Sequence, residues 1–423
     1  MTTASAPLSD TAASVDNAMG RRMLADRIFH HVMSVGGVSV IVAVSLIFFY
    51  LASVVVPLFV PPEIQSRAKF QMPGAADQAT AALSAEEQRE IGARLGQQGD
   101  IAFFKFADGN TVSQSAIPLP AGATVTAFDL GERATYSLGY GLSNGGVVLA
   151  KLGYAVTFPD GKRQITPSVQ YPLGEAPVSV DPRGMAIRQL SIQQSEEGST
   201  VAALTDDGRL LVSAVNVTKN LMTGEAKSEV QQAEIESPPQ AIRRLMVESK
   251  QRELYVLHGD HSLTRYDISN KTAPRRVETV EIAPDGRRVT AMTMLSGGFS
   301  IIVGTDAGEL AQWFLVRQDG NNFKLTRIRD FPAMPAAVTA LAPEFHRKGF
   351  IAGDQQGHLG SYFATSKRQL FIEKLADKPL TVLSIPPRGN GYLAQSADGK
   401  VYTAAVHNDF PEVSFHALWE KVW

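Results

Sequence analysis

STVAALTDDGRLLVSAV, the stretch from Ser199 to Val215, joins two apolar runs through a polar turn. The turn contains Asp207-Gly208, and an Asp-Gly pair supplies the backbone conformation of a tight β-hairpin. The same arrangement recurs at Arg252–Ile268, Phe299–Val316, Lys348–Ala364 and Asn390–Val406, with looser copies at Tyr136–Leu152 and Ile101–Ile117. Repeated hairpins are therefore the main building unit of this chain.

A short strand-like run precedes most of these hairpins. These runs are TVTAFDL (Thr124–Leu130), AIRQLSI (Ala186–Ile192), AIRRLMV (Ala241–Val247), VTAMTML (Val289–Leu295), VTALAP (Val338–Pro343) and LTVLSI (Leu380–Ile385). The turn glycines from Gly109 to Gly399 recur about every 48 residues, a period typical of propeller blades. One blade cannot cover its own apolar face, so successive blades pack side by side in a ring.

The spacing predicts an all-β fold, a seven-bladed β-propeller over residues 99–410. Six or eight blades are alternatives, and a β-sandwich or a pair of sandwiches is the rival architecture that the regular period disfavours. Ring closure requires the segment around Phe70–Ile101, or the tail after Val406, to complete the first blade. Residues 61–98 are predicted to be a linker with one short helix at Ser84–Leu95, where Ser84 and Glu87 match a capping box.

One segment near the N-terminus has the character of a membrane span. No charged residue occurs between Val32 and Val60, and a helix needs about 20 such residues to cross the hydrocarbon layer. A cleaved signal peptide would have an apolar region of only about 7–15 residues. The sequence therefore predicts a transmembrane helix at 32–60, preceded by a mostly disordered cytoplasmic segment at 1–31.

The charges beside this segment set its expected orientation. Arg21, Arg22 and Arg27 precede it, and Arg67 and Lys69 follow it. The positive-inside rule favours a cytoplasmic N-terminus. The repeat domain is then periplasmic, on the outer side of a bacterial inner membrane. Residues 411–423 are predicted to be an amphipathic tail whose apolar stripe either packs on the domain or returns to the membrane.

Composition excludes several classes of function. The 423 residues include no cysteine, which excludes disulfides, thiolate metal sites and cysteine nucleophiles. Lys+Arg number 40 against 42 Asp+Glu, and no basic stripe indicates nucleic-acid binding. The glycine cluster at Gly139–Gly146 lacks dinucleotide-loop spacing and is predicted to be a hairpin turn.

No residue is assigned to a catalytic, cofactor or metal site. His258, Asp260 and His261 form the one local cluster of ligand type, and three such ligands on one turn could reach a cation. A polar hairpin turn is the favoured interpretation. His30 and His31 are expected at the edge of the membrane helix. We therefore expect no enzyme activity, no cofactor and no metal; a quinoprotein-like dehydrogenase is the enzyme alternative that the missing cofactor motifs disfavour.

Both ends of the chain resemble a known family. DRIFHHVMSVGGVSVIVAVSLIFFYLASVVVPLF at 26–59 resembles the first transmembrane helix of the long-form, PstC-like phosphate ABC transporter permease of proteobacteria, and PEVSFHALWEKVW at 411–423 resembles the segment before that family's chain re-enters the membrane. In that family a large periplasmic repeat domain follows the first helix. The permease core is missing from this sequence, so no transport residue is carried over.

The resemblance implies an accessory domain that contributes to phosphate import without transporting by itself. Its implied partners are the membrane, the second permease subunit, the ATPase and the periplasmic phosphate-binding protein. The alternative is an independent, membrane-tethered propeller that acts as a scaffold for protein–protein interaction in the cell envelope. Broad loop-built faces suit propellers to that role, and a fold alone does not decide between the two functions.

Overall fold

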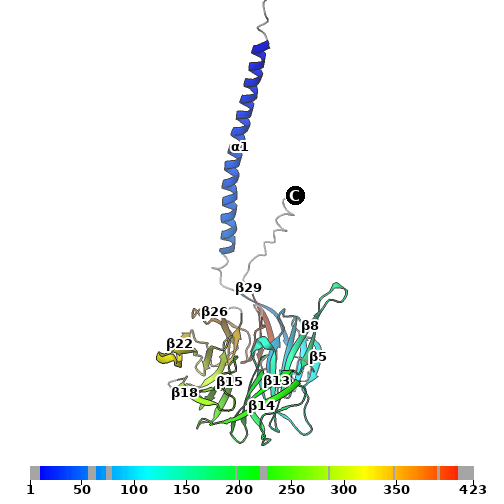
Figure 1. Cartoon of the computed structure of the whole chain (residues 1–423), viewed down its shortest axis with the longest axis vertical. Helices are drawn as coiled ribbons and strands as arrows, with labels where there is room; N and C mark the ends of the chain where they lie inside the picture. The colour runs from blue at the N-terminus through cyan, green and yellow to red at the C-terminus, as the bar shows by residue number, and fades with distance from the viewer. Residues whose placement is uncertain are drawn as a thin grey trace, which may run out of the picture. The chain divides into compact units, whose positions relative to one another are not determined.

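The computed structural model describes residues 10–55, 63–72, 79–195, 198–219, 226–283, 286–345, 348–387 and 391–407. Helix α1 (Asp10–Val55) belongs to one compact unit, and all the strands, from Glu63 to His407, belong to another. Figure 1 shows both units along the chain.

Helix α1 contains an apolar stretch, Asp26–Ser53, that is long and apolar enough to cross a membrane. The predicted span at 32–60 overlaps it as far as Val55, and residues 56–60 lie outside the described part of the chain. The predicted disorder of 1–31 is wrong from Asp10 onward, where the helix already begins. Residues 10–31 contain no proline and include several strong helix formers (alanine, methionine, leucine and arginine), which favour helix.

The strands of the second unit form seven sheets, which are the blades of a propeller (Figure 1). The first blade contains β2 (Thr80–Ala85), β3 (Ile91–Gly96), β4 (Asp100–Lys105) and β5 (Thr111–Ala116). The second contains β6 (Val125–Leu130), β7 (Ser137–Leu142), β8 (Gly146–Thr157), β9 (Gln164–Gln170) and β10 (Val178–Ser179). The third contains β11 (Ile187–Ser195), β12 (Gly198–Thr205), β13 (Leu210–Lys219) and β14 (Ala226–Ile235).

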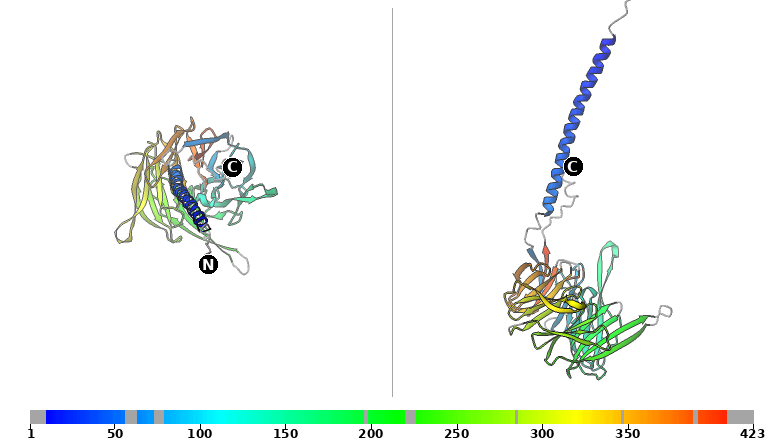
Figure 2. Two further views of the ribbon diagram at one scale, coloured as in Figure 1. Left: turned by 90° about the horizontal axis from the view of Figure 1, so that it is seen from above. Right: turned by 60° about the vertical axis from the view of Figure 1, so that its left-hand side comes forward.

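The remaining blades repeat this meander of antiparallel neighbours (Figure 2). The fourth contains β15 (Ile242–Val247), β16 (Glu253–His258), β17 (Ser262–Asp267) and β18 (Arg275–Glu281). The fifth contains β19 (Val289–Met294), β20 (Ser300–Thr305), β21 (Leu310–Arg317) and β22 (Phe323–Phe331). The sixth contains β23 (Val338–Glu344), β24 (Gly349–Asp354), β25 (His358–Phe363) and β26 (Gln369–Lys374). The seventh contains β27 (Leu380–Ser384), β28 (Gly391–Ser396), β29 (Lys400–His407) and β1 (Glu63–Gln71). The predicted seven-bladed propeller is confirmed.

The core of the propeller lies between blades. Seven clusters of buried apolar side chains each combine residues of two neighbouring blades, one cluster for each of the seven junctions. Between the fifth and sixth blades, for example, Phe331 packs edge-on against Phe350, which stacks on Tyr362. Because both faces of a blade are covered, its second strand is buried throughout, as in β20 and β24.

The ring closes through a strand from the N-terminal side of the domain. Strand β1 pairs antiparallel with β29, from Glu63 opposite His407 to Gln71 opposite Lys400. The seventh blade therefore takes three strands from the end of the domain and one from its beginning. The segment near Phe70 is one of the two predicted closing segments, but it completes the last blade and not, as predicted, the first.

The predicted helix at Ser84–Leu95 is wrong, and so is the linker at 61–98 that contained it. This region forms β2 and β3 with a tight turn between them. The run of glutamates and glutamine that suggested a helix forms that turn, where the buried Glu86 carboxylate accepts hydrogen bonds from the backbone of Gln88 (2.7 Å) and Glu90 (2.6 Å). Burial of Leu83 and Leu95 against neighbouring blades favours strands and overrides the local helix propensity.

The repeat at Ile101–Ile117 is shifted by one strand. It forms β4 and β5, whereas the other copies form the second and third strands of their blades. The corresponding hairpin of the first blade is β3–β4, and its turn glycine is Gly99, with φ of 89°. A left-handed residue closes this type of turn, as Gly308 (φ 82°) does in the fifth blade. The propeller therefore begins at Glu63, earlier than the predicted boundary at 99.

Candidate functional site

The candidate site is the central channel, a cavity of about 540 Å³. Its lining comes from the first strand of each blade and the residues next to it: β2, β6, β11, β15, β19, β23 and β27. These seven strands occupy the same position in their blades, so they run in the same direction along the channel. A strand of six residues spans about 20 Å, which separates the two ends of the channel.

Every channel strand carries the same irregularity at its second residue. The pairing with the next strand skips one residue there in all seven blades. The skipped residues are Ala81, Thr126, Arg188, Arg243, Thr290, Thr339 and Thr381. A β-bulge of this kind re-aims the side chain that it carries. Six of these seven equivalent side chains, all but Thr126, line one end of the channel.

Threonine is the common residue at this position, and its hydroxyl has a structural role. The Thr126 hydroxyl donates to the carbonyl of Ile187 in the next blade (2.7 Å), and the Thr339 hydroxyl donates to that of Leu380 (2.6 Å). The Thr290 and Thr381 hydroxyls each donate to a carbonyl within their own blade (3.3 Å). A satisfied hydroxyl of this kind holds the inner strands in register.

The third and fourth blades carry arginine at the same position. Arg188 and Arg243 replace the threonine, and Arg244 follows on the same strand. The inter-blade bond is taken over by Gln189, whose amide donates to the carbonyl of Ile242 (3.0 Å). Arg243 pairs with Asp260 (2.6 Å), whereas Arg188 and Arg244 have no hydrogen-bond or ion-pair partner within the described residues. One end of the channel is therefore basic.

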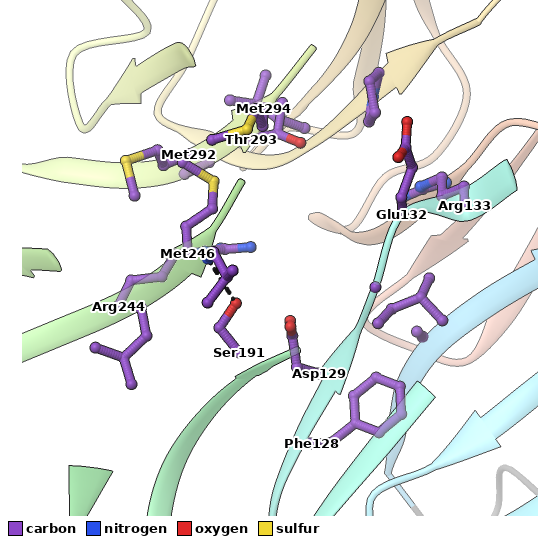
Figure 3. A pocket seen from close by; sticks show the side chains of 18 of the residues that line it. Phe128, Asp129, Glu132, Arg133, Ser191, Arg244, Met246, Met292, Thr293 and Met294 are labelled. Atoms are coloured by element: carbon purple, nitrogen blue, oxygen red, sulfur yellow. Dashed lines mark hydrogen bonds between the residues drawn. The ribbon is translucent and has the colours of Figure 1, made fainter. Parts of the chain in front are cut away.

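A half-buried carboxylate lies further along the channel. Asp129, on β6, accepts a hydrogen bond from the backbone of Ile192 in the next blade (2.8 Å). Burial raises the pKa of Asp129 to about 6, although the Ile192 amide and the positive charge of Arg244 oppose the rise. Burial lowers the pKa of Arg244, and Asp129 opposes that change. Figure 3 shows Asp129 and Arg244 on different strands of the channel wall.

The opposite end of the channel follows the last residues of the inner strands. Burial raises the pKa of Glu132, and the nearby Glu248 adds to this rise. Arg133 donates to the carbonyl of Leu383 in the seventh blade (2.9 Å), and burial lowers its pKa to about 10. Figure 3 shows Glu132 and Arg133 side by side. The channel is thus basic where its strands begin and carries both a carboxylate, Glu132, and a guanidinium, Arg133, where they end.

The histidine cluster singled out in the sequence does not form a metal site. His258 is buried, and its ring nitrogens contact the Gln240 amide oxygen (2.9 Å) and the Thr264 hydroxyl (2.8 Å). Burial lowers the pKa of His258, which favours the neutral ring. His261 lies 3.9 Å from Glu281, and Asp260 is taken by Arg243. No group of three or more possible metal ligands occurs in the described part of the chain.

The glycine cluster at Gly139–Gly146 lies in a hairpin, as predicted: Gly139 and Gly141 are in β7, Gly146 begins β8, and Gly145, in the turn between them, has φ of 79°. His30 and His31 lie on α1, where both side chains are exposed. The tail at 411–423 is outside the described residues.

The channel residues match no motif of a known site, so no functional residue is predicted there from the sequence. Arg188 and Arg243 stand in the strand-like runs AIRQLSI and AIRRLMV, and the other runs have threonine at the equivalent position. This contrast between repeats is the signal in the sequence, and it points to a channel only once the fold is known.

The fold and the site define a β-propeller protein with a charged central channel. No protein-family model and no curated protein matches the chain. Among solved structures, 1567 chains match, so the architecture is too common to select a function. One is the β-propeller domain of Cps50 (Swd1) from Myceliophteria thermophila, with a TM-score of 0.54 and 10% identity over 82% of this chain and 100% of that chain. At that identity the likeness shows the fold alone.

Replacing Asp129 with asparagine is expected to stabilise the propeller at neutral pH. The native state favours protonated Asp129, so it binds more protons than the unfolded state between about pH 4 and pH 6. The contribution of Asp129 to the free energy of unfolding is therefore most favourable below about pH 4. It becomes less favourable as the pH rises to about 6, and above that it no longer changes with pH. A rise of about two pKa units corresponds to a destabilisation of at most about 3 kcal/mol by the charged carboxylate. Water in the channel solvates this charge and makes the destabilisation smaller. Urea unfolding of residues 63–407 should show a gain of about 1–2 kcal/mol at pH 7.5 and almost none at pH 4.

The matched control is Asp206→Asn, which removes the same charge from an exposed turn. We expect it to change stability by less than about 0.5 kcal/mol at both pH values. An Asp129→Asn variant whose stability differed from that of the wild type equally at pH 4 and pH 7.5 would contradict the assigned titration.

Proposed function

We propose that this chain is a membrane-anchored binding scaffold of the bacterial cell envelope. Helix α1 would hold it in the inner membrane, and the propeller would recruit a partner protein through its central channel without catalysing a reaction. The observation that carries the proposal is the charged channel, where Arg188 and Arg244 are accessible and make no hydrogen bond or ion pair with the described residues, although the charge of Asp129 acts on Arg244. Polar groups left in a concave site of this kind are available for a ligand.

The exposure of α1 supports the anchoring part. All the described side chains of the apolar stretch are exposed or only partly covered; Val40, for example, is 63% exposed and Phe49 66%. Its 28 residues span about 42 Å as a helix, enough to cross the hydrocarbon layer of about 30 Å. Burial in lipid would remove this apolar surface from water. The charges at Arg21, Arg22 and Arg27 favour a cytoplasmic N-terminus and a periplasmic propeller.

The accessory role in a phosphate permease stays a prediction from the resemblance. It depends on residues 26–59 and 411–423, and it is compatible with a scaffold that binds transporter subunits. The two functions differ in the partner: the second permease subunit, the ATPase or the phosphate-binding protein in one case, and other envelope proteins in the other. Neither function requires the propeller to carry a catalytic residue.

Cell fractionation tests the anchor. We expect the full chain to stay with membranes after high-salt and alkaline washes, and residues 63–423 to move to the soluble fraction. A full-length control carries Val44→Arg and Ile47→Arg, which together cost about 5–7 kcal/mol at the centre of a membrane helix and should also release it. Retention of all three proteins in the membrane fraction would contradict anchoring by α1.

Crosslinking in cells tests the binding role. A photo-crosslinking residue at Thr290, on the channel wall, should capture a reproducible partner, and the same residue at the exposed Val277 on β18 should not. Capture of permease subunits or the phosphate-binding protein supports the accessory role, and capture of other envelope proteins supports the independent scaffold. A channel position that captures nothing beyond the Val277 control contradicts binding at the channel.

A further inference from the structure

We propose that the basic end of the channel, formed by Arg188, Arg243 and Arg244, binds the carboxylate side chains of an acidic segment in a partner protein. This inference rests on the proposed binding function and names the chemistry of its partner. It assigns these three arginines to recognition and the neighbouring channel threonines to the fold.

The comparison between blades separates the two roles. Four of the seven bulge positions carry threonine, whose hydroxyl donates to a carbonyl and secures the inner strands. Arginine at this position cannot make that short bond, and Gln189 supplies the inter-blade contact instead. The contact between the third and fourth blades therefore does not need Arg188, and the Arg188 guanidinium remains accessible at the channel end. A side chain that the fold does not use is available to a ligand.

The three guanidinium groups belong to adjacent strands. Arg188 starts β11, and Arg243 and Arg244 start β15, which lies beside β11 in the ring. All three side chains are accessible to water, and Arg244 lies within the channel, where the surrounding protein lowers its pKa. Arg243 already holds the Asp260 carboxylate at 2.6 Å. That pair shows within this chain that a carboxylate fits this site, and Arg188 and Arg244 remain for further ones. Planar guanidinium groups bind carboxylates through two parallel hydrogen bonds.

The surroundings favour an acidic peptide over a small oxyanion. Phosphate is usually held by several converging donors, which include backbone amides and hydroxyls. Here the threonine hydroxyls at Thr126, Thr290, Thr339 and Thr381 already donate to carbonyls. Arginines of two neighbouring strands, β11 and β15, lie at this end of the channel, within the reach of one extended segment whose residues are about 3.3 Å apart. Several carboxylates along one chain can then meet arginines on two blades.

Binding of a labelled peptide to the full chain in detergent micelles tests the proposal. The probe is a fluorescein-labelled peptide of ten glutamates, and the neutral reference is the same peptide with ten glutamines. We expect the glutamate peptide alone to bind. Arg188→Ala with Arg244→Ala should weaken its binding about 10- to 100-fold, because two charge-assisted hydrogen-bond pairs are lost. Arg188→Lys with Arg244→Lys should keep the charge and part of the affinity.

The control is Arg275→Ala with Arg327→Ala, which removes the same charge from the outer strands β18 and β22. Its affinity should stay within about twofold of the wild type. Equal loss in both double variants, or no loss in the channel variant, overturns the proposal. Competition by millimolar inorganic phosphate at constant ionic strength would identify a small-oxyanion site instead and also overturns it. Thermal melting of each variant confirms that it is folded. Membrane retention and crosslinking do not depend on this outcome, so the proposed function can stand if acidic recognition fails.

Discussion

Residues 73–423 are expected not to fold stably, whereas residues 63–423 fold. The two fragments differ only in the segment that holds β1 and Met72. Loss of β1 removes the ladder with β29 and leaves an unpaired edge in the seventh blade. Met72 is 2% exposed and packs with Leu83, Phe104 and Leu393 at the junction of the seventh and first blades. Truncating a buried methionine alone costs about 2–5 kcal/mol, a large part of a typical domain stability of about 5–15 kcal/mol.

Circular dichroism on heating measures this effect. We expect a cooperative transition for 63–423 and either no transition or aggregation for 73–423. A synthetic peptide of residues 63–72 should restore the transition when added to the shorter fragment, since β1 is an outer strand that can pair from outside. If both fragments melt within a few degrees of each other, the seventh blade is stable with three strands, and closure by β1 is not essential.

The closing strand also illustrates what the sequence could and could not predict. Hairpins with Asp-Gly turns, such as the one at Ser199–Val215, can be recognised from a short stretch of sequence, and the period at which they recur predicts the number of blades. Pairing of β1 with β29 joins residues more than 300 positions apart and has no local signal. The helix predicted at Ser84–Leu95 fails for a related reason. Its glutamates favour helix locally, whereas burial of Leu83 and Leu95 between blades decides the outcome.

The channel shows a second limit. Each inner strand is short, and the bulge at its second residue breaks the simple alternation of inward and outward side chains. Alternation counted from the buried Ile242 places Arg243 on the channel side and Arg244 on the other, but both line the channel. The charges at the opposite end are equally hidden, because Glu132 and Arg133 follow the end of β6 and carry no recognisable motif. Composition could not reveal this arrangement, because the two signs of charge nearly balance over the whole chain.

Asp100→Ala is expected to destabilise the propeller by about 3–5 kcal/mol. Arg94, on β3, is 1% exposed and forms an ion pair with Asp100 (2.5 Å), and its Nε donates to the Thr80 hydroxyl (3.2 Å). Removing the carboxylate takes a close anion away from a buried guanidinium, whose lost hydration is then less well compensated. The exposed pair of Lys374 and Asp377 is the control, and Asp377→Ala should cost less than about 1 kcal/mol. Urea unfolding of residues 63–407 measures both values.

The double variant Arg94→Met with Asp100→Ala distinguishes burial of a charge from simple loss of contacts. If the buried guanidinium is the source of the cost, replacing it with an apolar side chain of similar length should recover about 1–3 kcal/mol relative to Asp100→Ala alone. If loss of packing alone were the cause, the costs of the Arg94 and Asp100 substitutions would add, and the double variant would be less stable than Asp100→Ala. A double variant less stable than the single one would therefore reject the electrostatic explanation. Arg94 would then contribute chiefly through the contacts of its side chain at the junction of the first and second blades, next to Tyr140.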